Sequence, residues 1–146
     1  MNLKNGILAI DVGSGTQDIL VWRSGQSIEN CSKLILPSPT TIIARQMREA
    51  TKRGHHLFLT GHTMGGGPST KAVREHISTG LRVFALEQPA LTFHDRIDKV
   101  AAMGVEVVVQ KPSDKPLTQL EMGNLTLPAI EGALRLFHEP MPGIVA

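Results

Sequence analysis

The sequence has few aromatic residues and almost no cysteine. Its 146 residues include four Phe, one Trp and no Tyr, so the core must be built mainly from Ile, Leu, Val and Ala. Such a core favours a parallel-sheet α/β architecture over an all-β sandwich. Cys31 is the single cysteine, which excludes an internal disulfide framework and a cysteine-based zinc or iron–sulfur site within this sequence.

A strong charge bias and a long apolar run are also lacking. The formal net charge is +2 and the basic residues are scattered, which does not favour nucleic acid or an anionic membrane as a partner. No stretch approaches the roughly 20 apolar residues of a membrane span. Asp11 interrupts the first apolar run, which argues against a signal peptide. We therefore expect a cytoplasmic protein that binds neither nucleic acid nor membrane.

Apolar periodicity and turn residues predict the order β-β-β-α-β-α-β-α-β-loop-α within one domain, residues 1–146. We expect strands at 7–12, 17–23, 27–36, 56–60, 81–86 and 105–109. We expect helices at 40–53, 69–79, 92–103 and from Pro128 onward, with a polar loop at 110–118. Short turns make the first three strands antiparallel neighbours, whereas strands separated by helices should be parallel. The predicted fold is α/β: a mixed sheet that opens with a three-stranded antiparallel meander, followed by parallel β-α units.

The turn after the first strand has residues suited to phosphate binding. Glycines let backbone N–H groups approach an anion, Ser14 and Thr16 add hydroxyls, and Asp11 can hold hydrated Mg²⁺ through water. The segment is neither a Walker A loop nor a Rossmann fingerprint, because it lacks GxxxxGK[ST] and leads into a strand. A plain hairpin turn is the alternative. The candidate phosphate-binding residues are Asp11, Gly13, Ser14, Gly15, Thr16 and Gln17.

A second glycine-rich loop, residues 61–68, leads from a strand into a helix. The N-terminus of a helix behind such a loop favours anions, and Lys71 adds positive charge. The alternative is that the glycines only permit tight packing and that Ser69 caps the helix. The candidate residues of this loop are Gly61, His62, Thr63, Met64, Gly65, Gly66 and Lys71.

Other chemistry-bearing residues form no recognisable set. His55 and His56 are adjacent in a strand, so their side chains point to opposite faces and cannot share an ion. Asp95 and Asp98 lie on one helix beside cations, which is typical of a solvated face. Cys31 is expected to pack as a small apolar side chain.

The first turn, in its strand–turn–strand context, resembles the phosphate motif Asp-x-Gly-[Ser/Thr]-x-[Thr/Ser] of the actin/Hsp70/sugar-kinase superfamily. The order of elements is also similar to one lobe of that ribonuclease H-like fold. The resemblance implies an N-terminal lobe of a kinase or ATPase that binds ATP and Mg²⁺ at residues 11–17. It further implies that His62, Thr63 and Met64 face a cleft between two lobes, with His62 as a proton carrier or hydrogen-bond donor.

More closely, the segments ILAIDVGSGTQDILVW and LTGHTMGGGPSTKAV resemble an uncharacterised family labelled as related to pyruvate formate-lyase activating enzyme. A radical enzyme of that kind needs three cysteines at CxxxCxxC spacing to hold its iron–sulfur cluster. The sequence has Cys31 alone. We therefore keep the resemblance in fold and not the activity.

The superfamily resemblance also implies a second lobe, with a second Asp-x-Gly motif that Asp95, Asp98 and Asp114 do not provide. We therefore expect a truncated chain or a stand-alone lobe that is not catalytic alone. A half-site with about four hydrogen bonds, each contributing roughly 1 kcal/mol, reaches millimolar affinity at best. Two alternatives stay open. One is a non-catalytic module that pairs with another subunit or a second copy, and the other is a small-molecule sensor that uses residues 61–67.

Overall fold

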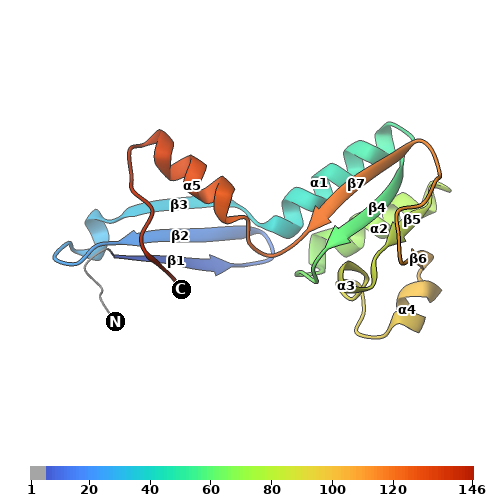
Figure 1. The fold of residues 1–146 in the computed structure, drawn as a ribbon, viewed down its shortest axis with the longest axis horizontal. Coiled ribbons are helices and arrows are strands. Elements are labelled where there is room, and N and C mark those ends of the chain that lie inside the picture. The colour runs from blue at the N-terminus through green and yellow to red at the C-terminus, as the bar shows by residue number, and fades with distance from the viewer. Residues whose placement is uncertain (1–5) are drawn as a thin grey trace. The chain divides into compact units, whose positions relative to one another are not determined.

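Backbone hydrogen bonds gather the described chain, residues 6–146, into two four-stranded sheets in this computed structural model (Figure 1). One sheet is mixed and the other is all-parallel, so the fold is mixed α/β. The chain divides into two units, each with its own sheet. Unit 1 comprises the described residues up to Ser38 together with Leu125–Ala146, and unit 2 comprises Pro39–Asn124.

The sheet of unit 1 contains the predicted antiparallel meander. Strands β1 (Ile7–Val12), β2 (Thr16–Trp22) and β3 (Ser32–Pro37) pair in chain order. The third strand is shorter than predicted, because the short 3-10 helix η2 (Ile28–Asn30) takes up its first residues. A two-residue strand, β8 (Ile144–Val145), pairs in parallel with β1 and was not predicted.

One helix, α5 (Leu127–Leu136), covers one face of the unit 1 sheet. Alternate strand residues, among them Leu8, Ile19 and Val21, point to this face and are at most 2% exposed. They form a core cluster with Ile130 and Leu134, which lie one helical turn apart on α5. The other face of this sheet carries a different set of side chains.

The sheet of unit 2 is parallel throughout, as the alternation of strands and helices predicted. Its order is β6 (Val105–Val107), β5 (Val83–Ala85), β4 (His56–Gly61) and β7 (Leu117–Met122). Strand β7 falls where the sequence analysis expected a polar loop and an unassigned segment. Its Leu120 and Met122 point into the core, whereas Gln119 and Glu121 between them are exposed.

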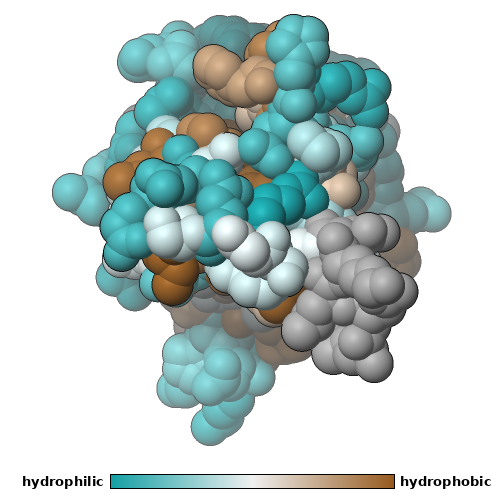
Figure 2. Space-filling view, turned by 90° about the vertical axis from the view of Figure 1, so that its left-hand side faces the viewer, coloured by the Kyte–Doolittle hydropathy of each residue, from teal (hydrophilic) through white to brown (hydrophobic). Residues whose placement is uncertain are grey.

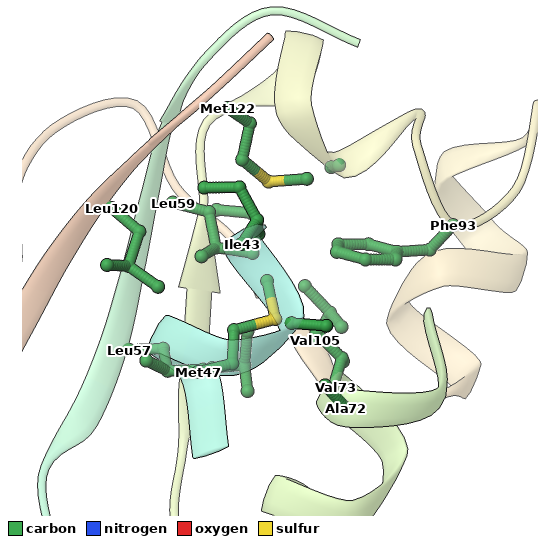
Figure 3. Close-up of a cluster of buried hydrophobic side chains, with 14 of the residues drawn as sticks. Ile43, Met47, Leu57, Leu59, Ala72, Val73, Phe93, Val105, Leu120 and Met122 are labelled. Atoms are coloured by element: carbon green, nitrogen blue, oxygen red, sulfur yellow. The ribbon is translucent and has the colours of Figure 1, made fainter. Parts of the chain in front are cut away.

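Four helices complete unit 2. They are α1 (Pro39–Lys52), α2 (Gly67–Ser78), α3 (Glu87–Ala90) and α4 (Ile97–Ala102). The predicted helix at 92–103 is wrong in its first turn, because Thr92–Arg96 form turns and bends and a separate short helix precedes them. Side chains from all four helices meet the strands in one apolar cluster, of which Figure 3 shows Met47, Leu59, Val73, Phe93 and Val105.

The opposite face of the unit 2 sheet is closed by an ionic cluster. Phe58 and Phe84 are buried but do not belong to the apolar cluster between the sheet and the helices. The Arg82 guanidinium lies 4.5 Å from the centroid of the Phe84 ring. The same guanidinium donates to both carboxylate oxygens of Glu106, at 2.8 and 2.7 Å, and pairs with Asp114. The Arg82 guanidinium thus covers the Phe84 ring and ties the start of β5 to β6.

The expectation of a single mixed sheet is therefore corrected to two sheets. The position beside β1 is taken by β8, and β4 is hydrogen-bonded by β5 and β7. Within the described residues 6–146, no helix is both long enough and apolar enough to cross a membrane.

His76 on α2 is a fully buried titratable group. Its Nδ1 lies 2.7 Å from Thr51 Oγ1, and its Nε2 is buried without a hydrogen-bond partner of good geometry among the described residues. Burial lowers the pKa of His76 below its ordinary value of 6.5 and the nearby His56 acts in the same direction, while the backbone of Arg82 partly offsets the shift.

This shift predicts a pH-dependent stability. As the pH falls through about 6.5, the unfolded chain binds a proton at His76 that the folded chain does not bind. The free energy of unfolding therefore has its full value above this pH and decreases as the pH falls below it. The slope from one such group is at most about 1.4 kcal/mol per pH unit. Denaturant titrations between about pH 7.5 and about pH 5.5 should show a smaller loss in His76→Gln than in the unmodified chain. Equal losses in the two proteins would contradict the assignment to His76.

Candidate functional site

The turn between β1 and β2 is a three-residue connection, residues 13–15, anchored from two sides. Gly13 N–H donates to the Thr16 carbonyl at 2.9 Å, which closes the hairpin. Ser38 N–H donates to the Gly15 carbonyl at 3.0 Å. Ser38 Oγ donates to the Ser14 carbonyl at 2.9 Å, and Ser38 is fully buried. The turn is therefore held by a residue that lies 24 positions away from Ser14 in the sequence.

These contacts fix the direction of two peptide groups. In a trans peptide the N–H points opposite to the preceding carbonyl. The carbonyls of Ser14 and Gly15 both accept from Ser38, one from its hydroxyl and one from its N–H, so a single residue holds both peptide groups. Consecutive N–H groups that point in one direction form the kind of concavity that binds anions.

Two carboxylates lie next to this turn. Asp11 near the end of β1 and Asp18 near the start of β2 are direct cross-strand partners, and both are exposed. Thr16 Oγ1 donates to Asp18 Oδ2 at 3.4 Å. Directly opposed like charges destabilise a strand pair, so a cation near both carboxylates would be stabilising. Neither Asp11 nor Asp18 has an ion-pair partner within 4.0 Å among the described residues.

Gln17, the last residue of the first candidate set, is used inside the sheet. Its side chain is 7% exposed, and its Nε2 donates to the Pro37 carbonyl at 3.0 Å. Side chains alternate along a strand, so Gln17 points to the face opposite to Asp18. Its amide therefore supports the pairing of β2 with β3.

The second glycine loop lies at the carboxyl end of β4 and is tied to two neighbouring segments, one at Thr92 and one at residues 122–124. His62 N–H donates to the Met122 carbonyl at 2.9 Å. Met64 N–H donates to Thr92 Oγ1 at 3.1 Å, and Gly65 N–H donates to Asn124 Oδ1 at 3.0 Å. Three N–H groups that an anion cradle would use are thus bonded within unit 2.

The glycines at 61 and 66 are needed for close packing. Gly61 has a φ of +89°, and a Cβ there would lie 2.2 Å from the Met122 carbonyl oxygen. At Gly66 a Cβ would lie 2.7 Å from the Thr92 carbonyl oxygen. By contrast, a Cβ at Gly65 would meet nothing within 4 Å. The packing role that sequence analysis kept as an alternative therefore accounts for two of these glycines.

The remaining candidates of this loop divide into exposed and buried residues. His62 and Thr63 are exposed at the carboxyl edge of the parallel sheet, the usual place for ligands in α/β folds. Met64 is 4% exposed and belongs to the core. Lys71 is exposed and lies 4.0 Å from Glu75 Oε1, in the second turn of α2. The prediction that Ser69 caps this helix is wrong, because the helix begins at Gly67 and Ser69 Oγ donates to the Gly66 carbonyl at 2.8 Å.

Three residues of these sites were missed by sequence analysis. Asp18 could have been found, because the predicted strands 7–12 and 17–23 leave a four-residue turn that places it opposite Asp11. Ser38 and Asn124 could not, since each reaches its loop only through tertiary contacts.

Comparison with known families matches residues 64–146 to the family described as "Putative pyruvate format-lyase activating enzyme (DUF1786)". The match covers more than half of the chain. The chain therefore belongs to the DUF1786 family. The matched range begins inside the second glycine loop and does not include the turn between β1 and β2. No curated protein and no solved structure matches the chain.

The activity in the description of the DUF1786 family can be tested against these residues. Radical activating enzymes hold an iron–sulfur cluster with several thiolates. The sequence has Cys31 alone, and that thiol is 5% exposed and directed to the Ser27 carbonyl at 3.4 Å. No group of three or more His, Cys, Asp or Glu side chains among residues 6–146 could hold a metal ion. These residues do not fit such a cluster.

The geometry of Gly61 generates a stability prediction. Gly61→Ala should lower the free energy of unfolding by at least about 2 kcal/mol, because the new Cβ meets a backbone oxygen and the φ is unfavourable for alanine. Gly65→Ala is the matched control, and its change should stay within about 1 kcal/mol. Denaturant titration measures both. Equal effects of the two substitutions would show that the contact between Gly61 and Met122 is not as close as described.

Proposed function

We propose that the turn between β1 and β2 binds the phosphates of ATP and that this chain is the nucleotide-binding lobe of an ATP-dependent kinase or ATPase. We further propose that the meander of unit 1 is the opening part of a ribonuclease H-like lobe of the actin/Hsp70/sugar-kinase type. In this proposal the chain is not catalytic alone.

The observation that carries the proposal is the anchoring of the turn by Ser38. The carbonyls of Ser14 and Gly15 both accept hydrogen bonds from this buried residue. A turn that is ordered before the ligand arrives loses less entropy on binding. The Ser14 and Thr16 hydroxyls add donors beside the backbone amides of the turn.

The carboxylates beside the turn suit the metal that accompanies a nucleotide. Mg²⁺ prefers oxygen ligands and keeps several of its waters, so one or two exposed carboxylates at its edge are sufficient. Asp11 would hold the hydrated ion, with its cross-strand partner Asp18 adding negative charge. Bound Mg·ATP supplies the phosphoryl group in this class of reaction, and these residues would bind and orient it.

The second glycine loop, in unit 2, is a candidate substrate-binding loop. Its exposed polar groups are the His62 imidazole and the Thr63 hydroxyl, which donates to the Gln88 carbonyl at 2.7 Å. We propose that these groups, with Gly61, Gly65, Gly66 and Lys71 in support, bind a substrate. Met64 would contribute through packing, because it is buried.

The proposal predicts a weak, local nucleotide site. In a titration of isotope-labelled protein with Mg·ATP, the backbone amides of residues 13–16 should shift with a Kd of about 1 mM, as expected for a few hydrogen bonds. Asp11→Ala should weaken binding about tenfold, because it removes the carboxylate beside the metal. NMR chemical shifts at each Mg·ATP concentration measure both constants.

Asp95→Ala is the matched control, because Asp95 is also an exposed carboxylate but lies in unit 2. It should leave the constant unchanged. If residues 13–16 do not respond to Mg·ATP, or if both alanine variants bind equally well, the turn is a structural hairpin and the proposal is wrong.

A further inference from the structure

Among the described residues of unit 1, no helix packs against the face of the sheet opposite α5. Residues that alternate with the core side chains point to this face, among them Ala9, Leu20 and Ile35. Ile35 is 71% exposed, although it lies in the middle of β3. A hollow of about 520 Å³ lies here, and most of its lining is apolar.

This face differs from the scattered exposure of apolar residues elsewhere. In the view of Figure 2, hydrophilic residues cover most of the surface and apolar residues are visible between them. Single exposed apolar residues are normal in proteins. An apolar hollow that extends over three neighbouring strands is typical of an interaction surface instead.

The charges on this face are arranged in a self-complementary way. Asp11 on β1 and Asp18 on β2 form an acidic pair at one side of the hollow, and Lys33 on β3 lines the hollow beside Leu20. None of the three has an ion-pair partner within 4.0 Å among the described residues. The charge of Lys33 helps to lower the pKa of Glu29, but it is the smallest of the causes of that shift.

We propose that this face binds a second copy of the chain, face to face, to form a two-fold symmetric dimer. A two-fold axis that runs along β2 between the copies places β3 of one copy above β1 of the other. Leu20 of each copy then packs against the Leu20 of its partner on the axis. Lys33 lies over Ala9 of the partner, two residues along β1 from Asp11, so its long side chain can reach the acidic pair. A symmetric interface requires a patch that complements itself, and this face carries both signs of charge around an apolar centre.

The size of the face predicts a weak dimer. Three strands about 4.8 Å apart, with about six residues of about 3.3 Å each, span roughly 300 Å² per copy. The total of roughly 600 Å² is below the 1,200 Å² or so of stable interfaces. We therefore expect a dissociation constant in the micromolar to millimolar range, with stronger association at low salt.

Sedimentation velocity on the full chain, up to about 1 mM protein and at about 50 and about 500 mM salt, tests the dimer directly. Lys33→Glu alone and the double variant Asp11→Lys/Asp18→Lys alone should each dimerise at least tenfold more weakly than the unmodified chain, because each places like charges opposite each other. An equimolar mixture of the two variants should recover dimers, since opposite charges then meet at both positions. Circular dichroism confirms that each variant is folded.

Lys111→Glu is the matched control, because it makes the same charge change at an exposed residue of unit 2. It should dimerise as the unmodified chain does. A chain that stays monomeric at the highest concentration would overturn the proposal and leave the face to a different occupant. A dimer that persists in both charge variants would also overturn it, because the contact would then involve another surface. No nucleotide is present, so the result does not depend on the phosphate site.

Discussion

The parallel pairing of β4 with strands on both sides is the constraint on which unit 2 depends. Leu57 and Leu59 of β4 are completely buried, and β5 and β7 satisfy the backbone groups on its two edges. Parallel neighbours require crossover connections, and these bring α2, α3 and α4 to the core. The same pairing gathers the carboxyl ends of the strands, so that the loop after β4 contacts the ends of β7 and α3. Gly61 permits this contact, because only a residue without a Cβ fits beside Met122.

The sequence was sufficient to predict elements that carry their own local signal. The meander is predicted by apolar runs separated by short glycine turns. The parallel β-α units are predicted by short apolar runs that alternate with segments in which apolar residues recur at helical spacing. Strand β7 was missed because Gln119 and Glu121 alternate with its buried residues after a proline-rich segment, which resembles a loop. Strand β8 has only two residues. The division into two sheets depends on these two strands, so it could not be predicted without them.

The candidate sites show the same limit. Residues 11–16 were identified from their types and spacing, and the turn that they form is present. What holds that turn is Ser38, a residue that no local pattern connects to it. In the second loop, the sequence pattern assigns the glycines to a ligand, although neighbouring backbone fills the space beside two of them, Gly61 and Gly66. Residue type predicts what chemistry a segment can perform, whereas hydrogen-bond partners decide which of its groups are already in use.

The interleaving of the two units along the chain has a consequence for synthesis. Unit 2 is continuous in sequence, whereas unit 1 needs β1–β3 from before it and α5 and β8 from after it. On the ribosome, unit 2 is complete before the residues that cover the meander have been made. The apolar face that α5 later covers therefore stays exposed throughout the synthesis of unit 2, which is the stage at which chaperones recognise nascent chains.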